Sequence, residues 1–124
     1  MTTTFGYEVI EGWEKLPAGY VHGNVQGVRV DSHDRVYVLT CWDPRLIIYE
    51  QDGTFVKSWG ENIFSPSVHG LELGPDGSVY ITDAGDHTVR KFTPDRSLHR
   101  PRWTGVCLKP AVECWGVFVP VRYH

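Results

Sequence analysis

Long apolar runs and paired cysteines are both missing from this sequence of 124 residues. No window of about 18 consecutive apolar residues occurs, so we expect no membrane-spanning helix. Cys41, Cys107 and Cys114 are odd in number and follow no CxxC spacing, which favours free thiols in a reducing compartment over a disulfide framework. The first seven residues lack a basic start and an apolar core, so no signal peptide is visible and a cytoplasmic protein is expected.

Strong charge of one sign is also lacking, because the formal net charge is only −3. Residues 1–95 carry fourteen acidic and seven basic residues, whereas residues 96–124 carry one acidic and five basic residues. These five are scattered among Pro, Trp and Val, so we do not expect nucleic-acid binding. No phosphate-binding loop, Ser/His/Asp signature or pair of carboxylates is visible. Gly, Pro and aromatic residues are frequent, which favours β structure with many turns.

An internal repeat of 43 residues is the strongest pattern in the chain. Residues 25–52 match residues 68–95 at this offset without a gap, and six of the 28 positions are identical. Apolar positions and turn residues match more often than identities do, which indicates a repeated structural unit. The identical residues of the first copy are Val25, Gly27, Val36, Tyr37, Asp43 and Asp52.

Each repeat has the pattern of short β-strands separated by turns. Val28 and Val30 alternate with Arg29, and residues 36–39 form a β-branched and aromatic run typical of a buried strand. Residues 46–49 and 55–59 are the next two expected strands. Four antiparallel strands in about 40–45 residues correspond to one blade of a β-propeller. A generic β-sandwich uses similar strands and turns, but the constant period favours the propeller.

The predicted fold is therefore all-β, with about two propeller blades and a remnant that form an incomplete ring in one chain. The pattern weakens after Asp95, where Pro101 interrupts the expected fourth strand at residues 98–102. The last part of the chain is either the degraded start of a third blade or an unrelated tail. The expected parts are an N-terminal segment with an edge strand at 7–13 (1–21), a first blade (22–62), a second blade (63–105) and this last part (106–124).

Two blades cannot close a ring, because propellers typically contain roughly 4–8 blades. An unclosed blade exposes a sheet face and strand edges that tend to pair with other chains. We therefore expect a homo-oligomer, a dimer or trimer in which the chains complete the ring. The alternative is a compact β domain of another kind, formed by the tail folding back, with residues 7–13 as an extra strand over one edge.

The second repeat resembles the NHL repeat. More narrowly, His69-Gly70-Leu71 and the spacing of Asp83 and His87 resemble the propeller of the peptidyl-α-hydroxyglycine α-amidating lyases. The resemblance covers about residues 7–95. The segments that carry it are SPSVHGLEL (65–73), PDGSVYITD (75–83) and DHTVRKFTPD (86–95).

That lyase family cleaves a hydroxyglycine-extended peptide into an amide and glyoxylate. The resemblance implies a six-bladed ring, a zinc ion held by three histidines and a calcium ion bound partly by backbone carbonyls. His69 matches one zinc ligand, and Val28 and Leu71 match positions whose carbonyls face the calcium ion. The family's arginine falls near Cys41, where this chain has no arginine. The blades that carry the catalytic tyrosine and the other histidines have no counterpart here.

A single histidine does not make a catalytic zinc site, which generally takes three protein ligands. Gln26 and Trp115 stand at the positions equivalent to His69 in the first repeat and in the possible third. A trimer would bring three copies of His69 to one axis, which is the number that zinc requires. The alternative for His69 is a hydrogen-bonded role beside the turn at Gly70.

The other polar candidates have structural interpretations. We expect His87 to face solvent in a turn, and Cys41 to be a buried small hydrophobe without a nearby base. Asp83 and Asp86 can bind calcium, but aspartates in such turns usually accept backbone N–H groups. The aromatic residues expected in the core or between blades are Trp42, Trp59 and Tyr80.

The sequence favours a truncated NHL-type propeller that acts as a binding or interaction module without catalysis of its own, for which a peptide is one candidate ligand. The alternative is a zinc-dependent enzyme, similar to the amidating lyases, that is assembled by oligomerisation. A third hypothesis is a non-functional remnant of a larger gene product. A propeller fold alone does not decide among them.

Overall fold

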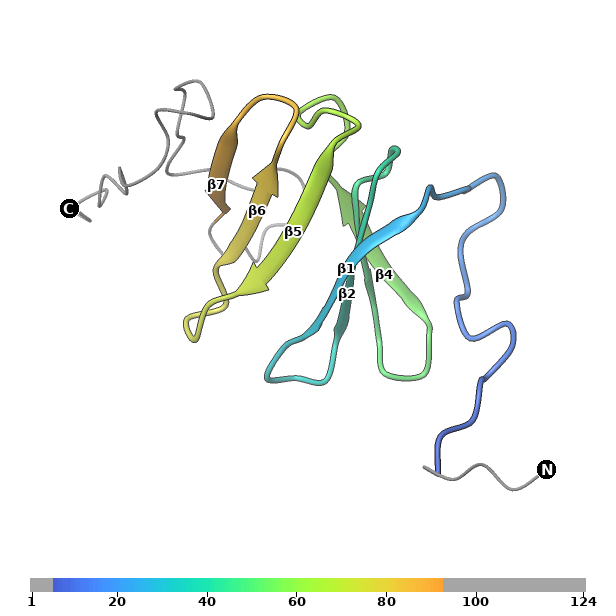
Figure 1. Cartoon of the computed structure of the whole chain (residues 1–124). Helices are drawn as coiled ribbons and strands as arrows, with labels where there is room; N and C mark the ends of the chain where they lie inside the picture. The colour runs from blue at the N-terminus through green and yellow to red at the C-terminus, as the bar shows by residue number, and fades with distance from the viewer. Residues whose placement is uncertain (1–5, 93–124) are drawn as a thin grey trace.

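A computed structural model describes residues 6–92 of the chain (Figure 1). These residues form β-strands and no α-helix, which confirms the predicted all-β class. Within the same residues there is accordingly no helix of the length and apolarity needed to span a membrane. The strands are β1 (Val25–Val30), β2 (Val36–Thr40), β3 (Leu46–Tyr49), β4 (Phe55–Trp59), β5 (Val68–Leu73), β6 (Val79–Asp83) and β7 (Thr88–Phe92).

The strands form two antiparallel sheets, of order β1-β2-β3-β4 and β5-β6-β7. The 43-residue repeat is confirmed at the level of strand register. Val28 pairs with Val38 in the first sheet, and Leu71 pairs with Ile81 in the second. The register shift between Val25 and Gly27 likewise recurs 43 residues later. The fourth strand expected at 98–102 and the last part at 106–124 lie outside the described residues.

Aspartate side chains fix the tight turns between the strands. Asp31, Asp52 and Asp76 each accept a hydrogen bond from the backbone amide two residues later, at 2.8, 2.9 and 3.0 Å. This local pairing occupies the backbone donors of the turn, so the chain reverses without leaving them unpaired. The turn positions were therefore predictable from the sequence.

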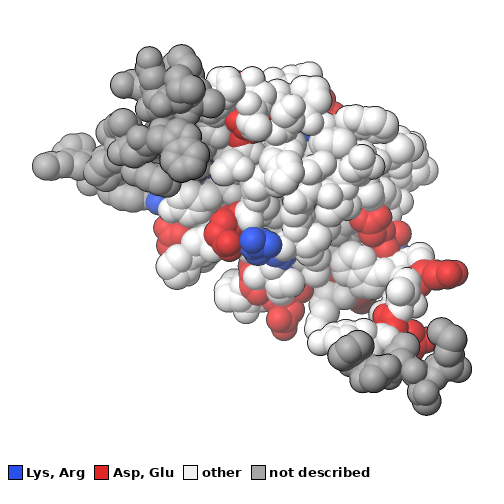
Figure 2. Space-filling model, in the orientation of Figure 1, with Lys and Arg blue, Asp and Glu red and all other residues white. Residues whose placement is uncertain are grey.

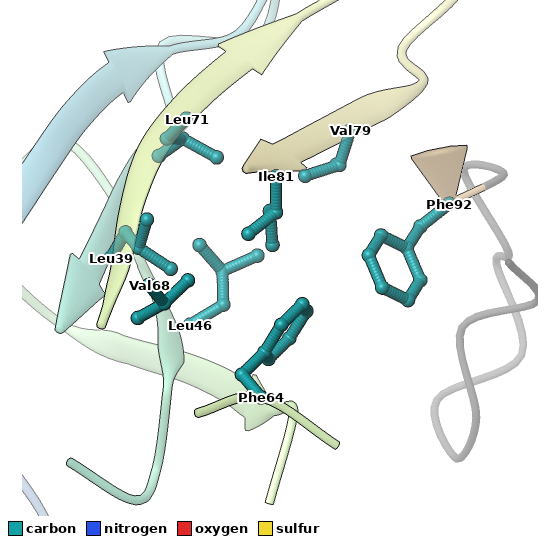
Figure 3. Close-up of a cluster of buried hydrophobic side chains, with 8 residues drawn as sticks. All are labelled: Leu39, Leu46, Phe64, Val68, Leu71, Val79, Ile81 and Phe92. Atoms are coloured by element: carbon teal, nitrogen blue, oxygen red, sulfur yellow. The ribbon is translucent and has the colours of Figure 1, made fainter. Parts of the chain in front are cut away.

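The core lies between the two sheets, where one face of each meets the other (Figure 3). The first sheet contributes Leu39 and Leu46, and β5 to β7 contribute the facing side chains. Phe92 joins the two halves, because its ring centroid lies 4.8 Å from that of Trp59 and 5.7 Å from that of Phe64. The buried members of this cluster are Leu39, Leu46, Phe64, Val68, Leu71, Val79, Ile81 and Phe92.

Of the three aromatic residues expected in the core, Trp59 packs against this cluster as predicted. The prediction for Trp42 is wrong, because this side chain is 61% exposed. Trp42 stands in the turn between β2 and β3, outside the alternation of the strands, and lies against the backbone of Gly23. Tyr80 is half-buried on the far side of the second sheet, where the Lys91 ammonium lies 5.5 Å from its ring centroid.

The edge strand expected at residues 7–13 is also wrong. These residues form no strand, and the side chains of Tyr7, Val9 and Ile10 are exposed. The chain turns at Gly12, whose φ is +69°, before it reaches the first sheet. Its first backbone bridge to the sheet is at Lys15, which pairs in parallel with Thr54.

The repeat offers a matched pair of positions for testing the core. Leu46 is fully buried, whereas Val89, its equivalent in the second sheet, is 36% exposed. Leu46→Ala should lower the free energy of unfolding by about 2–5 kcal/mol, because it opens a cavity between the sheets. Val89→Ala should lower it by less than about 1 kcal/mol. Urea denaturation measures both, and equal losses would contradict the location of the core.

Candidate functional site

His69, the predicted zinc ligand, lies on β5 and is exposed. Within residues 6–92, no group of three or more His, Cys, Asp and Glu side chains is arranged to hold a metal ion. The described side chains therefore do not bring a zinc site together around His69. Val28 and Leu71 occupy equivalent positions of β1 and β5, but the first side chain is exposed and the second is buried.

The other predicted positions have local structural partners. Asp83 is buried and accepts hydrogen bonds from the amides of Ser65 at 2.6 Å and of Gly85 at 3.0 Å, as expected for a turn aspartate. His87 is exposed in the turn between β6 and β7, again as predicted. Cys41 is half-buried rather than fully buried, because it stands at the open end of β2 beside Gly23.

Arg45 is a buried residue that the sequence pattern did not single out. Only 7% of it is exposed, and its guanidinium donates hydrogen bonds to the carbonyls of Phe64 at 3.1 Å and Ser65 at 3.0 Å. It also donates to the Asp43 carboxylate at 2.8 Å and to the Cys41 carbonyl. Arg45 therefore ties the turn before β3 to the connection between the sheets, which is a structural role.

The most distinctive surface is the face of the first sheet that points away from the second sheet, which we name the outer face. Paired residues on neighbouring strands share a face, so its members follow from the register. Most of their equivalents 43 residues later are side chains with which the second sheet packs on the first, although Arg90 stands at the position of Ile47. The apolar residues of the outer face are Val25, Val28, Val30, Val36, Val38, Ile47, Tyr49 and Phe55.

Part of the outer face is open to solvent along β1. Val25, Val28 and Val30 are 47%, 46% and 57% exposed. By contrast, Val68 and Leu71, the equivalents of the first two, are almost fully buried, and Leu73, the equivalent of Val30, is half-buried. The same positions are thus a protein interface in one repeat and surface in the other. Because exposed apolar residues are clustered here rather than scattered singly, this part of the outer face is a candidate interaction site.

The rest of the outer face is covered by residues 13–22, which we name the strap. The rings of Trp13 and Tyr49 lie 5.3 Å apart, and Leu16 packs against the same cluster. The strap is held by hydrogen bonds to the turn between β3 and β4. The Trp13 indole donates to the Gln51 carbonyl at 3.1 Å, and the Lys15 amide donates to the Gly53 carbonyl at 3.0 Å.

Gly53 permits this close approach. Its φ is +88°, and a Cβ atom at this position would lie 1.8 Å from the Trp13 carbonyl oxygen. Any other residue would therefore displace the strap or distort the turn. The glycine of the Gln51-Asp52-Gly53 turn thus serves the strap as well as the hairpin.

Glu14 anchors the middle of the strap. Its carboxylate lies 2.8 Å from the His22 Nε2 atom and accepts a hydrogen bond from the Tyr49 hydroxyl at 3.1 Å. The pKa of His22 is raised, first by the hydrogen bond to the Gly23 carbonyl and then by Glu14. The pKa of the Tyr49 phenol is also raised, mainly by burial and further by the negative charge of Glu14.

Basic residues form no continuous patch on the face of the molecule shown in Figure 2. Acidic side chains are scattered over that face, and basic ones occupy small areas beside them. No family model, no curated protein and no solved structure matches this chain. The outer face and the strap are therefore the features of the molecule from which a function can be inferred.

The Glu14 network predicts how His22 titrates. Its pKa should lie above the ordinary value of about 6.5, and Glu14→Gln should lower it only in part, because the larger contribution of the Gly23 carbonyl remains. NMR titration of the imidazole resonances measures both values. Because the folded-state pKa is raised, the stabilisation by His22 is complete below about pH 6.5 and is lost as the pH rises through the raised value. A His22 pKa that does not respond to Glu14→Gln would contradict the network.

Proposed function

We propose that this protein is a non-catalytic interaction module, a pair of NHL-type propeller blades whose ring is completed by further copies of the chain. The observation that carries the proposal is the outer face, where Val28 and Val30 are open although their equivalents take part in the contact between sheets. The partner that fits such a face best is another sheet of the same kind.

The contact within the chain is of the type that extends to further copies. The first sheet uses one face and the second sheet uses the opposite face, so the contact joins unlike surfaces. Contacts of unlike surfaces close into rings when the rotation per unit allows it. Propellers typically contain roughly 4–8 blades, and rings of two or three chains with two blades each fall within this range.

Charge also favours a second copy as the partner. Arg29 and Glu72 occupy equivalent positions 43 residues apart, and they form an ion pair of 3.2 Å between β1 and β5. These two strands lie beside each other (Figure 1). If a second copy repeats this arrangement, Glu72 of one copy meets Arg29 of the next. Arg29 and Glu72 would therefore form an ion pair both within the chain and between copies.

The face that a second copy would present is less apolar than its counterpart in the first sheet. Thr82 stands at the position of Leu39, and Lys91 at the position of Ile48, whereas Tyr80 repeats Tyr37. A contact between copies therefore buries less apolar area than the contact within the chain. We expect the assembly to be weaker than the fold, and to depend on protein concentration.

The non-catalytic part of the proposal is supported by Cys41, which stands where the resemblance to amidating lyases would require an arginine. A hydroxyglycine-extended peptide incubated with the protein and zinc tests this part directly. We expect no release of glyoxylate above the rate of the uncatalysed control. Release that depends on His69 would overturn it.

The outer face predicts a specific loss of self-association. Val28→Glu should weaken association at least about tenfold, because the contact would bury an unpaired carboxylate. Val9→Glu is the matched control, since Val9 is exposed and lies outside the outer face. Sedimentation velocity over a concentration series measures association, and circular dichroism verifies the fold. Equal association of the two variants, or a wild-type protein that stays monomeric at high concentration, would refute the proposal.

The charge pair predicts a rescue. Arg29→Glu places like charges at both the contact within the chain and the contact between copies, so association should weaken at low ionic strength. The double variant Arg29→Glu with Glu72→Arg restores opposite charges at both contacts and should recover association. The same sedimentation measurements test this pair. A double variant that associates no better than the single one would show that Glu72 and Arg29 do not meet.

A further inference from the structure

The strap covers residues that the proposed contact between copies requires. Val38 and Tyr49 of the outer face are equivalent to Ile81 and Phe92 in the second sheet. Ile81 and Phe92 are fully buried where the second sheet packs on the first. A second copy seated in the same way would bury Val38 and Tyr49, but Trp13 already lies there. The strap and a second copy therefore need the same surface.

The strap also reproduces the central contact between the sheets. In that contact, the Trp59 ring lies 4.8 Å from the Phe92 ring at an interplanar angle of 55°. On the outer face, the Trp13 ring lies 5.3 Å from the Tyr49 ring at 57°. Because Tyr49 is the equivalent of Phe92, Trp13 packs on Tyr49 as Trp59 packs on Phe92. The strap thus imitates the face that the first sheet presents to the second.

We infer that the strap is an intramolecular competitor of self-assembly, which occupies the outer face and must leave before a second copy can pack there. The inference rests on the proposed function, because it concerns access to the same face. It explains why only the β1 side of the face is open: the strap covers the β2 and β3 side.

The strap is attached to the first sheet in a way that allows it to be displaced. The backbone meets the sheet at a single isolated bridge, between Lys15 and Thr54, rather than as a paired strand. The remaining links are side-chain contacts, made by Trp13, Glu14, Lys15, Leu16 and Tyr20. Segments with few backbone hydrogen bonds to their neighbours open at a lower free energy than the core strands. Release of the strap therefore leaves both sheets intact.

The test compares variants of the full chain that loosen the strap in different ways. Gly53→Ala places a Cβ atom against the Trp13 carbonyl, and Trp13→Ala removes the imitating ring and its hydrogen bond to the Gln51 carbonyl while it keeps Gly53 in the turn. Gly12→Ala is the matched control, because Gly12 also has a positive φ but its Cβ would meet no atom within 4 Å. Hydrogen exchange of the Lys15 amide, which bonds to the Gly53 carbonyl, reports on the strap. Sedimentation velocity reports on association.

We expect Gly53→Ala and Trp13→Ala to speed exchange of the Lys15 amide and to tighten self-association about tenfold, which corresponds to roughly 1.4 kcal/mol. Gly12→Ala should change neither quantity by as much. If Gly53→Ala does not fold, Trp13→Ala is compared with Gly12→Ala instead. Faster exchange with unchanged or weaker association would overturn the competitor role and leave the assembly standing. Failure of every variant and the wild type to associate would overturn the proposed function itself.

Discussion

The packing of one sheet against the opposite face of its repeat is the contact on which the rest of the structure depends. A sheet of four short strands has two faces, and a unit of about 40 residues cannot cover both by itself. Leu46, Ile81 and Phe92 are fully buried only because the two units meet. Each side chain of this size contributes about 1.5–3 kcal/mol when it is removed from water, so the contact is a large part of a small protein's stability.

Within residues 6–92, that contact leaves one face of each sheet without a partner sheet, and these two faces differ in composition. At the second sheet, Thr82 and Lys91 make the terminal face more polar than its counterpart. At the first sheet, the apolar outer face is retained, and the strap covers the part around Val38 and Tyr49. Terminal repeats generally need a polar or covered outer face to remain soluble. The far face of the second sheet is therefore suited to contact with water by its polar residues. The outer face of the first sheet is instead partly covered by the strap.

The predictable features were those set by local sequence. The strands and their register follow from alternating side chains and from turn residues such as Asp31 and Asp76, so the 43-residue offset recurs in every strand pair shared by the two sheets. The strap and the buried Arg45 were not predictable, because both are defined by partners distant in the sequence. Nothing in residues 13–22 alternates like a strand, and an arginine next to a proline is typical of an exposed turn.

In the proposed assembly, a competitor on the same chain would set the concentration at which copies assemble. The strap is tethered beside its surface, which corresponds to an effective concentration in the millimolar range for a short flexible link. It makes two aromatic contacts, Trp13 with Tyr49 and Tyr20 with Phe55, and a few hydrogen bonds. In the proposed assembly, a second sheet would cover the whole outer face, including Val28 and Val30. The apparent affinity between copies is then the intrinsic affinity reduced by the fraction of open straps. On this proposal, the strap would occupy the outer face at low concentration, and the larger contact of a second copy would replace it at high concentration.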